Sequence, residues 1–352
     1  MSAGSSKPHI PTRALGKCGL DVSAISFGTG DNAGLMVKGS EAQQTAALAR
    51  ALELGINFFD TSPDYGKGLA ETNLGRALAT LRPPKVIVST KVEIMPSDLD
   101  DIAGKVVRSL DDSLRRLGRQ SVDILMIHNP PRLQRNSSAA HWTPLTPADF
   151  LGPALEGLER VRAQGKARHF GFTCENAEPA AVIPLLETGR FAAINCWYNL
   201  VNPTAGRALP LGVKVGVDYD DYGGIITAAG RCGVGVAVIR PLAGGGLTGQ
   251  VVAAGAAGRH ALAGGQYTRK PETFQPEIER ARAFAFLDRS DRSLPQAAYQ
   301  FALMHPSVST VVGGYSDLDQ LEEVAKAAGM GSLDAAEEQA VERVWACNFG
   351  LS

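Results

Sequence analysis

The chain has 352 residues, of which 44% are hydrophobic and 20% are charged, as in an ordinary globular protein. Its formal net charge of −1 gives no electrostatic attraction to nucleic acid or to an anionic membrane surface, so neither is expected as a partner. The five cysteines are widely spaced, odd in number and form no CxxC pair. This pattern argues against a disulfide framework and a structural zinc site, and it favours a reducing compartment.

The N-terminal residues 1–13 contain no apolar region of the kind found in secretory signals, and no apolar stretch is long enough to cross a bilayer. A cytoplasmic protein is therefore expected. An α/β barrel takes roughly 250 residues and grows with insertions, so a single domain over 1–352 with a core at about 12–347 suits this length.

Short apolar segments recur along almost the whole chain. Residues 13–23 predict a hairpin around a Lys-Cys-Gly turn. Buried strands are then predicted at 24–28, 56–60, 85–90, 122–128, 167–173, 192–196, 235–240 and 309–314.

Segments with helical periodicity lie between these strands. They cover 41–54, 99–117, 178–188, 294–304 and 317–328, and a further helix is predicted at 334–346. Alternating strands and helices imply parallel pairing through right-handed crossovers. Eight such units close most naturally into a (β/α)8 TIM barrel, with an N-terminal β-hairpin and an extra C-terminal helix. A doubly wound open sheet is the alternative topology.

Two long connections interrupt the alternation. Residues 129–148 are rich in proline and serine, and residues 241–275 begin with PLAGGGLTG and continue with glycine and alanine. Both follow the carboxyl end of a predicted strand, which is where barrels build their active sites, and long structureless loops in a compact domain are usually functional or disordered. A further insertion at 202–224 is expected to help shape the barrel mouth.

Four polar residues occur at or just after the ends of consecutive predicted strands. Asp60 ends the second strand, Tyr65 follows it in DTSPDYG, Lys91 ends the third strand and His128 ends the fourth. In a barrel these ends converge on one mouth, so the four side chains are expected to meet. Asp60, Tyr65, Lys91 and His128 are therefore the predicted catalytic core.

Each of the four also has an ordinary structural explanation. Asp60 suits a turn or helix cap, Tyr65 a loop aromatic, Lys91 a solvated strand end and His128 a core histidine. Their joint placement favours chemistry, because a lysine and an acid at neighbouring buried strand ends make sense as a pair. A phenol has a pKa of about 10, and a nearby ammonium lowers it, so Lys91 is expected to activate Tyr65 as a general acid.

The sequence resembles the aldo-keto reductase superfamily over about residues 12–347. The resemblance is carried by RALGKCGLDVS with ISFGTG, GINFFDTSPDYGKGLAETNLGRAL, VIVSTK, VDILMIHNP, GKARHFGFT, CWYNLVNP, RPLAGGGLTG and STVVGGYSDLDQLEE. The family's catalytic Asp, Tyr, Lys and His match Asp60, Tyr65, Lys91 and His128. The resemblance implies an NADP(H)- or NAD(H)-dependent oxidoreductase that interconverts carbonyl compounds and alcohols, with Tyr65 as general acid or base.

The resemblance also implies a set of cofactor contacts. The backbone of the glycine-rich loop is expected along the pyrophosphate, Thr173 and Asn195 at the carboxamide, and Gln320 and Glu323 near the adenosine. The complete expected set is Gly28, Thr29, Asp60, Thr173, Asn195, Arg240, Leu242, Gly244, Leu247, Gly313, Ser316, Gln320 and Glu323.

Some positions depart from the family pattern. Ile239 replaces an aromatic residue that stacks on the nicotinamide in many members, and Cys174 replaces a common asparagine. The final motif has Tyr315 and Ser316 where NADP-dependent members often carry an arginine for the 2′-phosphate. NADP(H) is the family default, and this absence leaves NAD(H) open as well.

The expected substrate is a small aldehyde, ketone or sugar. Tyr65, His128, Trp142 and Tyr198 are predicted to contact it, and the tail near Trp345 is expected to shape the mouth. An aldose 1-dehydrogenase, which oxidises a sugar to its lactone, is the alternative within the family. Two further alternatives are an aldolase that forms a Schiff base on Lys91 and a non-catalytic, cofactor-binding subunit. The sequence leaves the oligomeric state open.

Overall fold

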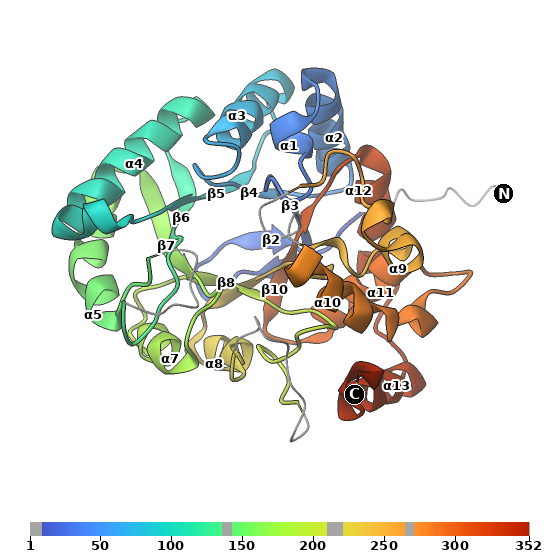
Figure 1. Ribbon diagram of the computed structural model, residues 1–352. Helices are drawn as coiled ribbons and strands as arrows, with labels where there is room; N and C mark the ends of the chain where they lie inside the picture. Colours follow the sequence, from blue (N-terminus) through green and yellow to red (C-terminus); the bar gives the residue numbers. More distant parts are fainter. Residues whose placement is uncertain (1–8, 136–142, 210–220, 265–270, 352) are drawn as a thin grey trace.

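The computed structural model describes residues 9–135, 143–209, 221–264 and 271–351 of the chain. Eight parallel strands close into a barrel in the order β10-β3-β4-β5-β6-β7-β8-β9, and helices surround it (Figure 1). Because β10 pairs with β3, no edge remains in this sheet, and the open doubly wound alternative is wrong. The predicted TIM barrel is confirmed.

All eight predicted barrel strands are present, and their ends differ from the prediction by no more than two residues. They are β3 (Ile25–Gly28), β4 (Phe58–Asp60), β5 (Ile87–Val92), β6 (Val122–Ile127), β7 (Ala167–Thr173), β8 (Ala193–Trp197), β9 (Gly235–Ile239) and β10 (Val308–Gly314). Three of them, β4, β5 and β8, are buried at every position, and the other five at all but one or two positions. Helices cover the outside of the barrel and side chains fill the inside, which explains the continuous apolar sequences.

The predicted helices are also present, together with several that the periodicity did not single out. The helices are α1 (Leu35–Lys38), α2 (Glu41–Glu53), α3 (Leu69–Leu81), α4 (Ile102–Leu117), α5 (Pro147–Asp149), α6 (Leu155–Ala163), α7 (Pro179–Glu187), α8 (Ile225–Cys232), α9 (Gly249–Ala254), α10 (Pro271–Arg282), α11 (Leu294–Met304), α12 (Leu318–Ala325) and α13 (Ala335–Ala346). The expectation of an irregular loop over 241–275 is wrong, since α9 and the start of α10 lie within it.

The N-terminal hairpin closes one end of the barrel. Its strands β1 (Thr12–Ala14) and β2 (Asp21–Ser23) pair antiparallel, as predicted. Leu15, Leu20 and Val22 from the hairpin form a separate apolar cluster with barrel residues that include Phe58 and Ile87, which begin β4 and β5. The amino ends of the strands are therefore plugged, which leaves the carboxyl ends for a site.

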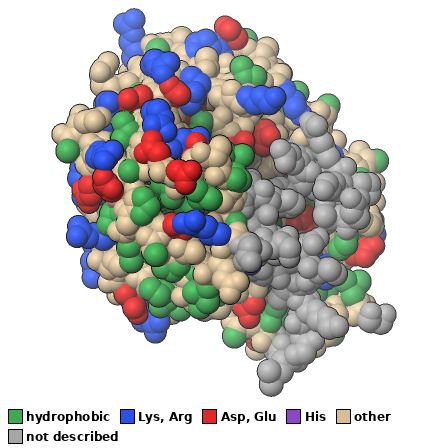
Figure 2. All heavy atoms as spheres, turned by 60° about the vertical axis from the view of Figure 1, so that its left-hand side comes forward, with side chains coloured by type: hydrophobic (Ala, Val, Ile, Leu, Met, Phe, Trp, Pro, Cys, Tyr) green, Lys and Arg blue, Asp and Glu red, His purple; other side chains and the backbone are tan. Residues whose placement is uncertain are grey.

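The outer surface carries both signs of charge. On the face shown in Figure 2, basic and acidic side chains are interspersed and no large patch of a single sign gathers. No helix among the described residues is both long and apolar enough to cross a membrane.

A buried ionic network ties α3 and α4 to the barrel beside Lys91. The Glu71 carboxylate on α3 is fully buried, and it accepts hydrogen bonds from Thr90 Oγ1 on β5 (2.5 Å) and from Arg116 Nε on α4 (2.6 Å). The Thr90 hydroxyl is buried too. Glu71 therefore fixes the outer side of the strand whose next residue, Lys91, points into the barrel.

Removing this carboxylate should destabilise the fold. Glu71→Ala is expected to lower the free energy of unfolding by about 3–5 kcal/mol, because it leaves the Thr90 hydroxyl and the Arg116 guanidinium without their partner. Urea denaturation measures the change. Glu41→Ala is the matched control, since Glu41 also pairs with an arginine (Arg76, 2.6 Å) but is 80% exposed, and a loss below about 1 kcal/mol is expected there. Equal losses in the two variants would contradict this role of Glu71.

Candidate active site

The four predicted catalytic residues meet at the open end of the barrel. Asp60 is the last residue of β4, Lys91 lies one residue before the end of β5, and His128 follows β6 directly. Tyr65 comes from the turn between β4 and α3, and its ring centroid is 6.0 Å from that of His128. Adjacent strands in the barrel order thus place side chains from three strand ends and one turn in a single cluster.

Lys91 and Asp60 form a buried ion pair beneath Tyr65. Lys91 Nζ donates to Asp60 Oδ2 at 2.6 Å and to the Thr61 carbonyl oxygen at 2.9 Å. The two charged side chains are only 1% and 6% exposed. The ammonium also lies 4.9 Å from the centroid of the Tyr65 ring. Two hydrogen bonds therefore fix the position of the ammonium under the phenol.

The pKa values at this cluster favour neutral Tyr65 and neutral His128. Burial raises the pKa of Tyr65 well above that of an ordinary phenol, and the carboxylates of Asp60, Glu175, Asp31 and Asp64 raise it further. Burial, with a smaller contribution from the Lys91 charge, lowers the pKa of His128 well below its ordinary range. The expectation that Lys91 would lower the pKa of Tyr65 is wrong in this structure, because burial and the surrounding acids outweigh one ammonium.

His128 is oriented by the turn that carries Tyr65. Its Nδ1 is 3.4 Å from the Ser62 hydroxyl, and Ser62 is fully buried. With the Ser62 hydroxyl as donor to Nδ1, the neutral ring carries its proton on Nε2 and can donate from there. The cluster can thus offer two neutral donors, the phenol and the imidazole, to one oxygen atom.

A cavity of about 1090 Å³ opens above this cluster. Asp60, Tyr65 and His128 line it, whereas Lys91 lies buried behind them. Of the expected cofactor residues, those in its lining are Gly28, Asp60, Arg240, Leu242, Gly244, Ser316, Gln320 and Glu323. Ile239 lines it as well. One continuous space therefore joins the four predicted catalytic residues (Asp60, Tyr65, Lys91 and His128, called the tetrad below), the glycine-rich loop and the start of α12.

The other expected cofactor residues are buried without forming part of the lining. Thr29 Oγ1 is hydrogen-bonded to Thr61 Oγ1 (2.8 Å), and Leu247 is fully buried in the core. At Gly313, a Cβ would lie 2.2 Å from the Tyr315 hydroxyl, so only glycine fits there without rearrangement. These three residues lie behind the cavity lining, and their contact with a cofactor stays a prediction.

Thr173 and Asn195 are buried side by side on paired strands and share an unusual feature. Thr173 on β7 is in register with Asn195 on β8. Both are at most 2% exposed, and neither Thr173 Oγ1 nor Asn195 Oδ1 has a hydrogen-bond partner among the described residues. Buried polar atoms are rarely left this way, so each can accept a hydrogen bond from a bound molecule.

Arg240 follows β9 with a left-handed backbone (φ 52°) and lines the cavity. Its guanidinium stacks 4.1 Å above the Trp197 ring, and its Nη2 donates to Glu277 Oε1 on α10 at 3.3 Å. The Asn199 side chain holds the Arg240 carbonyl oxygen (2.9 Å). These contacts fix the start of the glycine-rich loop.

Tyr198 does not reach the cavity, so its predicted contact with substrate is wrong in this structure. Side chains alternate along a strand, and this places Asn195 and Trp197 toward the barrel interior and Tyr198 toward the helices. The Tyr198 ring packs against Phe301 on α11 (centroids 4.9 Å apart) and against His305. Trp142 lies outside the described residues.

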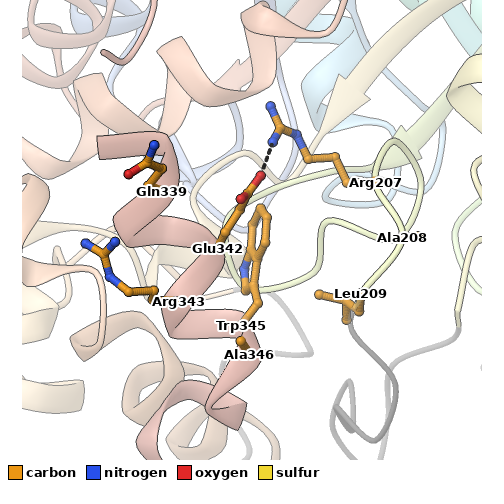
Figure 3. Close-up of a pocket in the computed structure, with 8 residues that line it drawn as sticks. All are labelled: Arg207, Ala208, Leu209, Gln339, Glu342, Arg343, Trp345 and Ala346. Atoms are coloured by element: carbon orange, nitrogen blue, oxygen red, sulfur yellow. Dashed lines mark ion pairs between the residues drawn. The ribbon is translucent and has the colours of Figure 1, made fainter. Parts of the chain in front are cut away.

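A second cavity of about 620 Å³ lies between residues 207–209 and α13, away from the tetrad (Figure 3). Glu342 faces Arg207 across it at 3.6 Å. Trp345 belongs to this cavity, and its Nε1 donates to the Leu200 carbonyl oxygen (2.8 Å). The expectation that Trp345 shapes the barrel mouth is therefore wrong.

The sequence interpretation missed four acids, three of which (Asp31, Asp64 and Glu175) act electrostatically on Tyr65. Asp31, Asp64, Glu93 and Glu175 all line the large cavity. They follow the carboxyl ends of β3, β4, β5 and β7 within four residues. This shared position just after strand ends is the feature of the sequence that could have identified them as residues of the site. Among the described residues, no group of three or more His, Cys, Asp and Glu side chains is arranged to hold a metal ion.

A barrel with a buried Lys–Asp pair beneath a tyrosine and a histidine defines a class of oxidoreductases that act on carbonyl groups. The model of the aldo/keto reductase family matches residues 24–346. The chain belongs to the aldo/keto reductase family, and it is accordingly an oxidoreductase of the EC 1.1.1 type.

Two relatives of this chain carry the names of sugar dehydrogenases. L-Galactose dehydrogenase of Arabidopsis thaliana is 30% identical over 94% of this chain and 92% of its own length. D-threo-Aldose 1-dehydrogenase of a Pseudomonas species is 28% identical over 90% of this chain and 92% of its own. An aldo-keto reductase structure from Bacillus halodurans, in its holo form, matches with a TM-score of 0.69 at 23% identity over 96% of both chains, which supports the fold.

Proposed function

We propose that this chain transfers hydride between a nicotinamide cofactor and a small carbonyl compound or alcohol, with the Tyr65 hydroxyl donating or accepting the proton. The observation that carries the proposal is the cluster itself: Tyr65 and His128 face one cavity, and the Lys91–Asp60 pair (2.6 Å) lies directly behind them. Four residues of these types in this arrangement serve general acid–base chemistry better than any structural purpose.

The cavity suits a nicotinamide cofactor. Leu242 and Gly244 line the cavity where an extended pyrophosphate could pass. The unsatisfied Thr173 Oγ1 and Asn195 Oδ1 are buried outside this lining, so they could accept hydrogen bonds from a carboxamide only after side chains of the cavity wall move. The cofactor, when bound, supplies the hydride for reduction or accepts it for oxidation.

The protein's own residues handle the proton and the oxygen atom. Because its pKa is raised, Tyr65 is protonated at neutral pH and can donate to the substrate oxygen during reduction. His128 is neutral and can hydrogen-bond the same oxygen without adding charge. Lys91, held by Asp60, places a positive charge next to the phenol, where negative charge develops as the proton leaves.

The activity can be tested by mixing the protein with NADH, NADPH, NAD⁺ and NADP⁺ against panels of aldehydes, ketones, alcohols and aldoses. Absorbance of the reduced nicotinamide reports turnover. We expect cofactor-dependent turnover in at least one combination. Cofactor binding without turnover anywhere in the matrix would favour a non-catalytic barrel instead.

Oxidation of a sugar at its anomeric carbon is a second candidate within this reaction. The observation in its favour is that both sugar dehydrogenases named above match this chain along nearly its full length. L-Galactose with NAD⁺ or NADP⁺ is the first substrate to try, and release of a lactone, read by mass spectrometry, would support it.

Schiff-base chemistry on Lys91 fits the geometry poorly. The Lys91 side chain is 1% exposed, and its ammonium already bonds to Asp60 and to the Thr61 carbonyl. A nucleophilic lysine must be neutral and reachable by the substrate carbonyl. Borohydride reduction in the presence of a carbonyl compound should therefore leave Lys91 unmodified.

We also infer a preference for NAD(H) over NADP(H). Near the start of α12 the cavity lining contains Asp317, Asp319 and Glu323, and the segment 309–324 contains no arginine or lysine. Arg259 and His260 also line the cavity, but Arg259 stacks on Phe274 and His260 lies 3.4 Å from Asp317. An additional phosphate beside these carboxylates would be repelled.

This preference predicts that NADH binds at least about tenfold more tightly than NADPH, which corresponds to about 1.4 kcal/mol. Fluorescence titration of the wild-type protein measures both dissociation constants. Asp319→Asn combined with Glu323→Gln should narrow the ratio by removing two negative charges. Tighter binding of NADPH to the wild type would contradict the inference.

A cytoplasmic location remains the proposal for this chain. It rests on the five cysteines, all of which are free in the structure and suit a reducing compartment.

A further inference from the structure

Four carboxylate side chains that follow strand ends line the same cavity as Tyr65 and His128. Asp64 and Glu93 line it beside Tyr65 and His128, and Asp31 and Glu175 line it as well. Asp31, Asp64 and Glu93 come from the ends of β3, β4 and β5, which are neighbours in the barrel, and Glu175 follows β7. We call these four residues the acidic rim.

The members of the acidic rim act on one another and on Tyr65. Burial is the main cause that raises the pKa of the Asp64 carboxyl, and Asp31 raises it further. Burial and then Asp64 raise the pKa of Glu93 to about 7. Asp31, Asp64 and Glu175 also raise the pKa of the Tyr65 phenol. Their charges therefore reach the point where the reacting carbonyl oxygen would lie.

Two members of the acidic rim, Asp64 and Glu93, have no cationic partner among the described residues. Neither the Asp64 nor the Glu93 carboxylate has a hydrogen bond or ion pair with any residue that the structure describes. Lys91 is paired with Asp60. Lys105, the lysine that lowers the pKa of Glu93, forms its ion pair with Asp98 at 2.8 Å. The arginines in the cavity lining, Arg240 and Arg259, both lie on the connection that follows β9.

We propose that the acidic rim selects uncharged carbonyl compounds or sugars as substrates and rejects carboxylates and phosphates. This inference rests on the proposed function and names the substrate class for the same site. An anionic group placed beside Asp64 and Glu93 would meet like charges in a partly desolvated cavity, where repulsion is stronger than in water. Hydroxyl groups, in contrast, can donate hydrogen bonds to these carboxylates.

Selection by substrate charge can be tested with two nearly isosteric aldehydes. They are para-carboxybenzaldehyde, which is anionic, and para-nitrobenzaldehyde, which is neutral. The quantity measured is the ratio of their kcat/KM values, so that changes common to both substrates cancel. We expect Glu93→Gln to raise the carboxy/nitro ratio by roughly fivefold to tenfold, and Asp64→Asn combined with Glu93→Gln to raise it further. Glu41→Gln removes an exposed charge outside the cavity lining and should leave the ratio unchanged.

The pH dependence of the same ratio provides a second readout. The groups acting on Glu93 are Asp64, Asp98 and Lys105. Because the pKa of Glu93 is about 7, its negative charge grows between pH 6 and 8, while para-carboxybenzaldehyde is ionised throughout. The carboxy/nitro ratio of the wild type should therefore fall as pH rises, and the Glu93→Gln variant should show a flatter profile.

Failure of the inference can be distinguished from failure of the proposed function. If both aldehydes turn over and the ratio is the same in wild type and rim variants, the acidic rim does not select by charge. If neither aldehyde turns over, calorimetric dissociation constants of the two aldehydes for the same proteins decide the question. A preference for the nitro compound that weakens in the variants supports the rim, and equal binding overturns it.

Discussion

Replacing Tyr65 with phenylalanine is expected to lower kcat by roughly two to four orders of magnitude while leaving the cofactor dissociation constant within about twofold of wild type. The substitution removes one hydroxyl group and keeps the ring that packs at 6.0 Å from His128 and 4.9 Å from the Lys91 ammonium. The fold has little reason to change, because the hydroxyl faces the cavity rather than the core. Stopped-flow or steady-state turnover measures kcat, and fluorescence titration measures cofactor binding.

A control variant tests whether the loss of any tyrosine hydroxyl in the cavity lining has the same effect. Tyr299→Phe removes a hydroxyl from a tyrosine that also lines the cavity but lies on α11, away from the tetrad. Its kcat should change far less than that of Tyr65→Phe. If Tyr65→Phe retained near-normal kcat, Tyr65 would not be the proton donor.

The second large effect concerns the buried pair of Lys91 and Asp60. Lys91→Met should abolish most turnover and also lower the free energy of unfolding by about 3–5 kcal/mol, because it leaves the Asp60 carboxylate buried without its partner. Such a loss is a large fraction of the total stability of a typical protein. Urea denaturation and kcat together measure the two consequences.

The double variant Asp60→Asn with Lys91→Met distinguishes the loss of stability caused by an unpaired buried charge from the loss of catalysis. With both charges removed, no ionic group is stranded, so much of the stability should return while turnover stays low. Arg108→Met is the control for a surface ion pair, since Arg108 and Asp101 are 61% and 59% exposed and the loss should stay below about 1 kcal/mol. Recovery of turnover in the double variant would contradict a catalytic role for the pair.

The sequence was sufficient for the barrel and for the tetrad because both depend on local patterns. Buried strands appear as continuous apolar segments, and Asp60, Lys91 and His128 each stand at the end of one. Once strand order is known, closure of the barrel brings these ends together without further information. Helix α9 within the glycine-rich connection was missed because its short sequence, GQVVAA, carries little amphipathic signal.

The surroundings of the tetrad were harder to predict because they depend on contacts between distant segments. The acidic rim comes from four separate turns, and no periodicity links Asp31 to Glu175. The raised pKa of Tyr65 follows first from burial and then from Asp60, Glu175, Asp31 and Asp64, and the sequence alone reveals neither the burial nor the nearness of these acids. The position of Tyr198 was predicted wrongly because the register of β8, which decides the side to which each side chain points, is not fixed by the local sequence.

The central claim is that this site transfers hydride from a nicotinamide cofactor to a carbonyl carbon while Tyr65 supplies the proton. The most direct measurement uses reduced cofactor carrying deuterium at the transferable position, with para-nitrobenzaldehyde as acceptor and mass spectrometry of the alcohol. We expect one deuterium on the carbinol carbon with the wild-type protein and little labelled alcohol with Tyr65→Phe. Alcohol without deuterium, or equal labelling by the two proteins, would contradict it.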